Sequence, residues 1–185
     1  MPRYDADWID SMLQPDRRGA PPAEQTLAHL DLKAGQIVAD VGCGPGFFTL
    51  PAARMVGPTG LVYAVDVEPT MLNLVRARAT AENLHHIEIR PSHRDRIPLD
   101  DATADLTICA LLLHDVDDRP GLVRELIRIT RRNGRIAVVE WVPDPDDPRP
   151  NRLHPQETAS LFAHSGYPVR ETSPLGARQY LLIAG

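Results

Sequence analysis

The chain has 185 residues, of which 43% are hydrophobic, and it carries a formal net charge of -5 with a pI near 5.8. A chain of this length buries about two-thirds of its unfolded surface in one core, so its size predicts a single domain. The acidic balance disfavours nucleic acid as a partner, because binding to phosphates depends on clustered Lys and Arg.

The apolar runs are too short for the roughly 20 residues that a transmembrane helix needs. Residues 1–5 do not have the basic and then apolar layout of a signal peptide. We therefore expect a cytoplasmic protein with no membrane partner. Cys43 and Cys109 are too few for a disulfide framework and form no CxxC pair, so we expect no metal site and two reduced thiols.

The N-terminal residues 1–20 are predicted to form a polar arm, with Trp8 in its one apolar cluster. A helix is expected after Pro21 and Pro22, and Gly35 ends this segment just before the first strand.

The rest of the chain alternates short apolar runs with helical patterns. Strands are predicted at 37–41, 61–65, 87–89, 104–109, 135–141, 168–172 and 178–184. A helix at 69–80 and another at 155–164 fit the pattern. A further helix is capped by Asp117 or Asp118 and is expected to run to Arg132, with a stop at Asn133 and Gly134. This order predicts an α/β fold, with a mostly parallel sheet covered by helices on both faces.

A glycine-rich turn follows the first predicted strand, with glycines at 42, 44 and 46. Glycine has no Cβ, so the backbone of such a turn can approach a ligand closely. Asp66 ends the second strand, where a carboxylate can accept hydrogen bonds from both hydroxyls of a ribose. An ordinary strand-to-helix turn and a helix N-cap are the structural alternatives. Together, the two features predict a nucleotide-like cofactor.

Two residues near this turn favour a cofactor other than NAD. A dinucleotide fingerprint has its third glycine at position 47, where Phe47 would hinder the approach of a pyrophosphate. Asp40 places a negative charge beside the turn, which suits an ammonium or a sulfonium better than a pyrophosphate. We therefore expect a ligand that is cationic at one end.

Residues 38–49, 63–66 and 71–72 closely resemble the first two motifs of the class I S-adenosylmethionine-dependent methyltransferases, in particular the small-molecule group called methyltransferase type 11. Weaker matches at 97–99, 105–114, 125–134 and 139–141 follow in the family's order, so the resemblance covers most of the chain. It implies S-adenosylmethionine as the cofactor and a small molecule as the methyl acceptor. It also implies a Rossmann-like, doubly wound, seven-stranded sheet of order 3-2-1-4-5-7-6 with an antiparallel last strand.

The resemblance further implies where the cofactor lies, with its methionine end on the glycine turn, its ribose at the acid after strand two and its adenine over the loop after strand three. The implied contacts are Asp40, Gly42, Cys43, Gly44, Asp66, Val67, Met71, His93, Arg94 and Cys109. His93 stands where the family often has an acid, so either Asp95 or the backbone N–H of Arg94 is expected to serve the adenine.

The implied organisation is an arm and helix at 1–30 that cover the cofactor site and a single methyltransferase domain at 31–185, in a monomer or homodimer. Because the resemblance places strands one and four side by side, Cys43 and Cys109 are expected near each other at the ligand edge.

Methyl transfer from a sulfonium is an in-line displacement, so a base is needed only if the acceptor loses a proton. His114, beyond the fourth strand, is the candidate base, with a cap or packing role as its alternative. Glu140 and Trp141 are candidate substrate residues, because a carboxylate and an indole together can hold a cationic or aromatic acceptor. Trp8 and Arg152 are candidate lid residues.

Two other functions stay open. One is a nicotinamide-dependent oxidoreductase, which Phe47 and the lack of a second, substrate-binding half disfavour. The other is a protein that binds S-adenosylmethionine without catalysing a reaction, as a regulator or assembly partner.

Overall fold

The computed structural model describes residues 6–14, 19–93, 96–144 and 151–185. The helices are α1 (Ala6–Leu13), α2 (Ala23–His29), α3 (Thr49–Val56), α4 (Pro69–Ala81), α5 (Arg119–Ile129) and α6 (Pro155–His164). The strands are β1 (Ile37–Val41), β2 (Leu61–Asp66), β3 (Ile87–Pro91), β4 (Ala104–Ala110), β5 (Thr130–Trp141), β6 (Val169–Leu175) and β7 (Gln179–Ala184). Within these residues, none of the helices has both the length and the apolar character to cross a bilayer.

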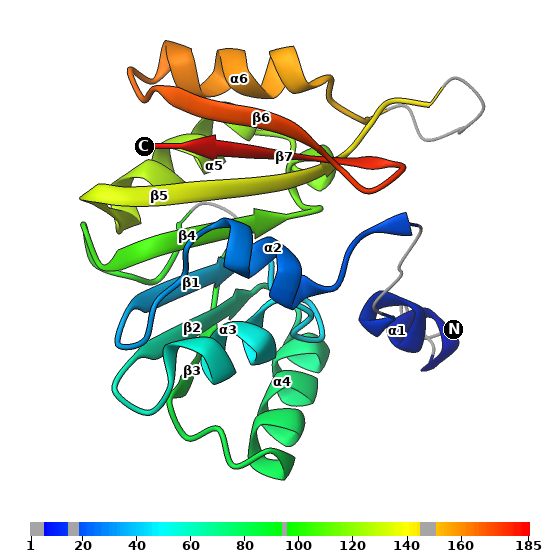
Figure 1. Ribbon diagram of the computed structural model, residues 1–185, viewed down its shortest axis with the longest axis vertical. Coiled ribbons are helices and arrows are strands. Elements are labelled where there is room, and N and C mark those ends of the chain that lie inside the picture. Colours follow the sequence, from blue (N-terminus) through cyan, green and yellow to red (C-terminus); the bar gives the residue numbers. More distant parts are fainter. Residues whose placement is uncertain (1–5, 15–18, 94–95, 145–150) are drawn as a thin grey trace.

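The strands form one sheet, in the order β3-β2-β1-β4-β5-β7-β6 (Figure 1). The five strands β1 to β5 run parallel to one another. β7 runs antiparallel to both β5 and β6. The predicted Rossmann-like α/β fold and its strand order are therefore confirmed. In such a sheet the carboxyl ends of the parallel strands meet at one edge, which is where ligands bind.

The helices cover the two faces of the sheet in separate groups, with α2, α3 and α4 on one face and α5 and α6 on the other (Figure 1). Side chains along a strand point alternately to the two faces. In β5, Ala137 and Val139 accordingly pack into the core beside α2 and α3, whereas Ile136 and Val138 pack into the core beside α5 and α6. Adjacent residues at the end of β5 therefore face opposite sides of the sheet.

Helix α5 begins as the sequence predicts but ends earlier. Of the two candidate caps, Asp118 is the N-cap, and its carboxylate accepts a hydrogen bond of 2.8 Å from the Gly121 N–H. The predicted end at Arg132 is wrong, because the last helical residue is Ile129 and β5 starts at Thr130.

Thr130 explains the early end of α5. Its backbone is extended, with φ -85 and ψ 134, and it pairs with Ala104 of β4. Its hydroxyl donates to the Leu126 carbonyl at 2.7 Å and lies 2.7 Å from the Thr107 hydroxyl. A side-chain bond to the preceding turn competes with continuation of the helix. The pairing of Thr130 with β4 therefore ends the helix before the stop that Asn133 and Gly134 predict.

We predict that Leu126→Ala lowers the free energy of unfolding by about 2–5 kcal/mol, because the side chain is fully buried between α5 and the sheet and its removal leaves a cavity. Urea denaturation monitored by circular dichroism measures this change. Arg124→Ala on the exposed side of the same helix is the control, and an equal loss in both variants would contradict the packing described.

Candidate active site

The glycine turn after β1 has the left-handed backbone that glycine favours. The φ angles are 72° at Gly42, 51° at Gly44 and 92° at Gly46. A Cβ on Gly42 would lie 2.8 Å from a methyl carbon of Leu112, and one on Gly46 would lie 2.7 Å from a methyl carbon of Leu50. Conformation and space therefore both require glycine at these two positions.

Asp66, the last residue of β2, is joined to this turn. Its Oδ2 accepts a hydrogen bond of 2.9 Å from the Gly44 N–H, and its Oδ1 accepts one of 2.9 Å from the Glu68 N–H. Val67, the next residue, is 48% exposed, whereas Met71 is buried in the first turn of α4. Three predicted cofactor contacts thus follow β2 in sequence, and the first of them shapes the turn.

The Asp40 carboxyl is buried at the end of β1, and its Oδ2 accepts a hydrogen bond of 2.5 Å from the Thr49 hydroxyl. Burial raises the pKa of Asp40 to about 7; the Thr49 bond opposes this rise and the charge of Asp66 adds to it. A cation beside Asp40 would favour its ionised form. The site therefore holds a carboxyl that changes charge near neutral pH.

A cleft with about 660 Å³ of empty space, counted with its open mouth, adjoins the glycine turn. Four predicted residues line it: Asp40, Gly42, Cys43 and Gly44. Phe47, considered above only as an obstacle to a pyrophosphate, also lines it, and so do Phe48, Leu111 and Val139 from the matched motifs. The sequence analysis did not single out Met12, Thr26 and Gln179, which line it as well. They come from separate parts of the chain and belong to no local pattern.

The N-terminal segment supplies one wall of this cleft. Met12 of α1 approaches the turn so closely that a Cβ on Gly44 would lie 3.1 Å from its methyl carbon. The Gly19 carbonyl accepts a hydrogen bond of 3.2 Å from the N–H of Ala177, in the turn between β6 and β7. Figure 1 shows α1 at the edge where the parallel strands end. Trp8 lies in α1, but its side chain is outside the described part of the structure.

His114 and Glu140 are brought together by the fold. His114 Nδ1 lies 2.8 Å from Glu140 Oε2, and the His114 N–H donates to Glu140 Oε1 at 3.3 Å. The Glu140 side chain is 0% exposed and the imidazole is 16% exposed. Arg119 Nε donates to the Leu113 carbonyl at 3.1 Å, which fixes the turn before the histidine. The carboxylate thus orients the ring, although neither residue lines the cleft described above.

Two further predicted residues, Trp141 and Arg152, also meet. The Arg152 guanidinium lies 5.5 Å from the centroid of the buried Trp141 ring, and it donates to the Val142 carbonyl at 3.0 Å. This cation–π pair lies at the end of β5.

The remaining predicted contacts are dispersed. Cys43 and Cys109 are both free and buried, and burial raises the pKa of each thiol. Cys43 lines the cleft, whereas Cys109 packs into the core beside α5. His93 is exposed and forms an isolated bridge with Arg96. Arg94 and Asp95 lie outside the described residues.

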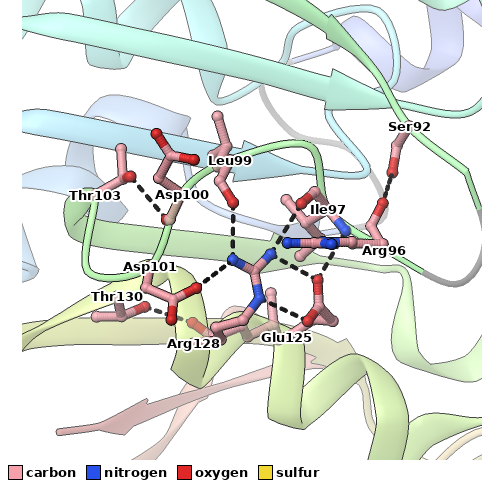
Figure 2. A network of polar contacts seen from close by, with 11 residues as sticks. Ser92, Arg96, Ile97, Leu99, Asp100, Asp101, Thr103, Glu125, Arg128 and Thr130 are labelled. Carbon is pink, nitrogen blue, oxygen red and sulfur yellow. Dashed lines mark hydrogen bonds and ion pairs between the residues drawn. The ribbon is translucent and has the colours of Figure 1, made fainter.

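A single arginine holds the loop between β3 and β4 (Figure 2). Arg128 of α5 donates to the carbonyls of Ile97 at 2.9 Å and Leu99 at 2.8 Å. It also pairs with Asp101 at 2.8 Å and Glu125 at 2.7 Å. Glu125 Oε2 in turn accepts a hydrogen bond of 2.9 Å from the Ile97 N–H. Two side chains from one helix therefore fix both backbone groups of Ile97.

This loop performs the packing role of a helix. The described part of the connection from β3 to β4 contains none, and Ile97 and Leu99 instead pack against Ala39, Val41 and Val65 of the first two strands. Arg128 and Glu125 thus position the segment that carries Ile97 and Leu99 into this core. The sequence analysis noted residues 125–134 only as part of a weak match.

Comparison with known proteins gives one consistent family. The family described as "Methyltransferase domain" matches residues 39–138. The chain is 28% identical over 117 residues to the demethylmenaquinone methyltransferase of Halalkalibacterium halodurans, and this alignment covers 63% of this chain and 48% of the relative. It is 29% identical over 147 residues to the arsenite methyltransferase of Halobacterium salinarum, and this alignment covers 78% of this chain and 37% of the relative. The chain therefore spans about half, or less, of the length of these relatives.

Solved structures extend the likeness to the whole chain. A SAM dependent methyltransferase from Aquifex aeolicus has a TM-score of 0.88 at 27% identity, with 98% of both chains covered. The 4+2 cyclase SpnF has a TM-score of 0.75 at 15% identity, with 87% of this chain and 79% of that chain covered. The second comparison shows the fold alone, since one fold can carry different reactions.

We predict that the stability of the protein depends on the ionisation of Asp40. The folded-state pKa of about 7 lies above the ordinary 3.8, so the folded protein holds this proton more tightly than the unfolded chain does. The ionised carboxylate therefore destabilises the fold fully above pH 7, and this penalty disappears as the pH falls toward 4. Asp40→Asn should raise the melting temperature at pH 8.5 much more than at pH 5. Asp100→Asn, at an exposed site, is the control, and a shift independent of pH would contradict the prediction.

We predict that Arg128→Met loosens the loop between β3 and β4 and costs about 2 kcal/mol of stability, because Glu125 and two backbone carbonyls lose their charged partner. Hydrogen exchange at residues 96–103 should become faster. Arg124→Met, one turn earlier and exposed, should leave the exchange rate unchanged. Unaltered exchange in Arg128→Met would show that apolar packing alone holds the loop.

Proposed function

The chain belongs to the family of class I S-adenosylmethionine-dependent methyltransferases, and from this premise we propose that it transfers the methyl group of S-adenosylmethionine to a small-molecule acceptor. The observation that carries the proposal is the meeting of Asp40, the left-handed glycine turn and Asp66 beside one cleft. These groups suit an adenosyl sulfonium better than a pyrophosphate, because Asp40 and Asp66 are carboxyl groups, and the Arg78 guanidinium, which also reaches the turn, is hydrogen-bonded to the Pro45 carbonyl at 2.6 Å.

We propose that Asp66 accepts hydrogen bonds from the ribose hydroxyls and that Gly42, Cys43 and Gly44 contact the methionine end of the cofactor. The fit rests on the turn, where a Cβ at Gly42 would collide with Leu112, and on the titrating carboxyl of Asp40 beside it. An ammonium near Asp40 would stabilise its ionised form. The same proposal extends, in order along the chain, to Val67, Met71, His93, Arg94 and Cys109.

The bound cofactor would supply an electrophilic methyl group. For an acceptor that loses a proton, we propose His114 as the general base. Glu140 is fully buried and bonded to His114 Nδ1, so it would act as a positioning residue for the ring rather than as a substrate contact. Nε2, which lies 3.6 Å from Asp115 Oδ2, is the nitrogen proposed to exchange the proton.

The acceptor side is proposed to be closed by α1, with Trp8, and by the stacked pair of Trp141 and Arg152. Met12 and Phe48 support this arrangement, since both line the cleft and their apolar side chains would exclude water from it. Water exclusion strengthens the electrostatic attraction between the carboxylates and a cationic ligand. Residues 1–30 would then act as the cover and 31–185 as the catalytic domain.

We predict that S-adenosylhomocysteine binds the purified protein and that Asp66→Ala weakens this binding by roughly 10- to 100-fold, the loss expected for one or two charge-assisted hydrogen bonds. Isothermal titration calorimetry measures the affinity. Asp117→Ala, at an exposed position outside the cleft, is the matched control. Heat with NADH and none with S-adenosylhomocysteine would favour the oxidoreductase alternative.

The reaction itself is tested with methyl-labelled S-adenosylmethionine and a metabolite extract. We expect label to move into a small molecule, and His114→Ala to slow the transfer without weakening the binding of S-adenosylhomocysteine. Binding of the cofactor without any transfer of label would instead favour a regulatory or assembly role.

A further inference from the structure

An unsatisfied hydroxyl lies in the wall of the cleft. Thr26, in α2, is 2% exposed, and its Oγ1 has no hydrogen-bond partner among the described residues. Thr26 lines the cleft beside the glycine turn. A threonine in a helix ordinarily bonds back to the carbonyl of the preceding turn. A buried hydroxyl without such a bond is available to form a hydrogen bond with a molecule that enters the cleft.

A second buried polar side chain lines the same cleft. Gln179, the first residue of β7, is 4% exposed and pairs with Trp141 of β5 across the sheet. The next residue, Tyr180, points to the other face, where its hydroxyl lies 2.7 Å from the Thr158 hydroxyl. The alternation of the strand therefore directs the Gln179 amide to the side of α2, in a strand whose other residues belong to the core.

The surroundings of these two side chains are apolar. Pro21, Leu111, Val139 and Leu175 are among the residues that line the cleft, and Asp40 is the one charged side chain in its described lining. No Lys or Arg among the described lining residues is available to pair with an anion. A carboxylate or phosphate would lose its hydration here without a compensating charge, which is costly. The lining thus selects against molecules with a net negative charge, whereas the single carboxylate of S-adenosylmethionine is outweighed by its own ammonium and sulfonium.

We propose that Thr26 and Gln179 form the acceptor subsite, and that the acceptor is a neutral, largely apolar small molecule with an uncharged oxygen, either a hydroxyl or a carbonyl. The Thr26 hydroxyl and the Gln179 amide each donate and accept, so they can bond both kinds of oxygen. A site of this design rejects a molecule that lacks the oxygen, because its own buried groups would stay unpaired. The identification as an acceptor subsite rests on the proposed function, whereas the ligand chemistry rests on the lining.

The test uses 2-naphthol as the probe, because it has an apolar body with one neutral hydroxyl, and 2-naphthoate as its anionic counterpart. Calorimetric titrations are made with the full chain, both alone and saturated with S-adenosylhomocysteine. We expect 2-naphthol to bind and 2-naphthoate to bind at least about tenfold more weakly. Thr26→Val and Gln179→Leu should each weaken 2-naphthol binding by about 5- to 10-fold and leave the affinity for S-adenosylhomocysteine unchanged. Thr26→Ser should keep the wild-type affinity.

Thermal stability separates a ligand-binding role from a structural one. Thr26→Val keeps the shape of the side chain but removes the unsatisfied hydroxyl, so the melting temperature should rise by about 2–4 °C while 2-naphthol binding falls. Thr158→Val is the matched control, since Thr158 is equally buried but bonded to Tyr180, and its melting temperature should fall. A lower melting temperature in Thr26→Val would assign the hydroxyl to folding and overturn the proposal.

The remaining outcomes are also decisive. Equal affinity for 2-naphthol and 2-naphthoate, or unchanged 2-naphthol affinity in both variants, would overturn the subsite. Weaker binding of S-adenosylhomocysteine in Thr26→Val or Gln179→Leu would assign the pair to the cofactor and likewise overturn it. If S-adenosylhomocysteine does not bind at all, the proposed function fails, and the titrations of 2-naphthol alone still test the subsite.

Discussion

The hydrogen bond from the Gly44 N–H to Asp66 is the contact on which the site depends. It ties the turn after β1 to the end of β2, two strands that the sheet holds side by side. The left-handed glycines allow the turn to reach this carboxylate without a clash. The group proposed to bind ribose is thus also the group that shapes the backbone around the ligand. Asp66 would thus serve both in the recognition of the cofactor and in the local folding of the turn.

The two faces of the sheet carry different parts of the site. Val139 and Glu140 are adjacent in β5, yet Val139 lines the cleft beneath α2 whereas Glu140 is buried against His114 on the side of α5. This division follows from the alternation of side chains along a strand. The proposed reaction would therefore take place across the rim of the sheet, with the apolar binding surface on one side and the imidazole on the other.

The fold was predictable because its signals are local. Glycines 42, 44 and 46, the acid at Asp66 and the alternating apolar runs each lie within a short stretch of chain. Thr26, Gln179 and Arg128 were not predicted, since their importance comes from contacts between distant segments, and a threonine in a helix or a glutamine in a strand carries no signal of its own. The end of α5 was wrong for the same reason: pairing of Thr130 with β4 is a tertiary effect.

Helix α5 holds two parts of the site at once. Near its start, Arg119 fixes the turn that carries His114, and near its end Arg128 fixes the loop over the first two strands. A helix rises by about 1.5 Å per residue and hardly stretches, so it acts as a rigid spacer between these two attachment points. The proposed site of the adenine lies over this loop, so the length of one helix would set the separation of the imidazole from that site. Insertions elsewhere on the surface would leave that spacing intact, whereas one residue added between the two attachments within α5 would rotate one by about 100° relative to the other.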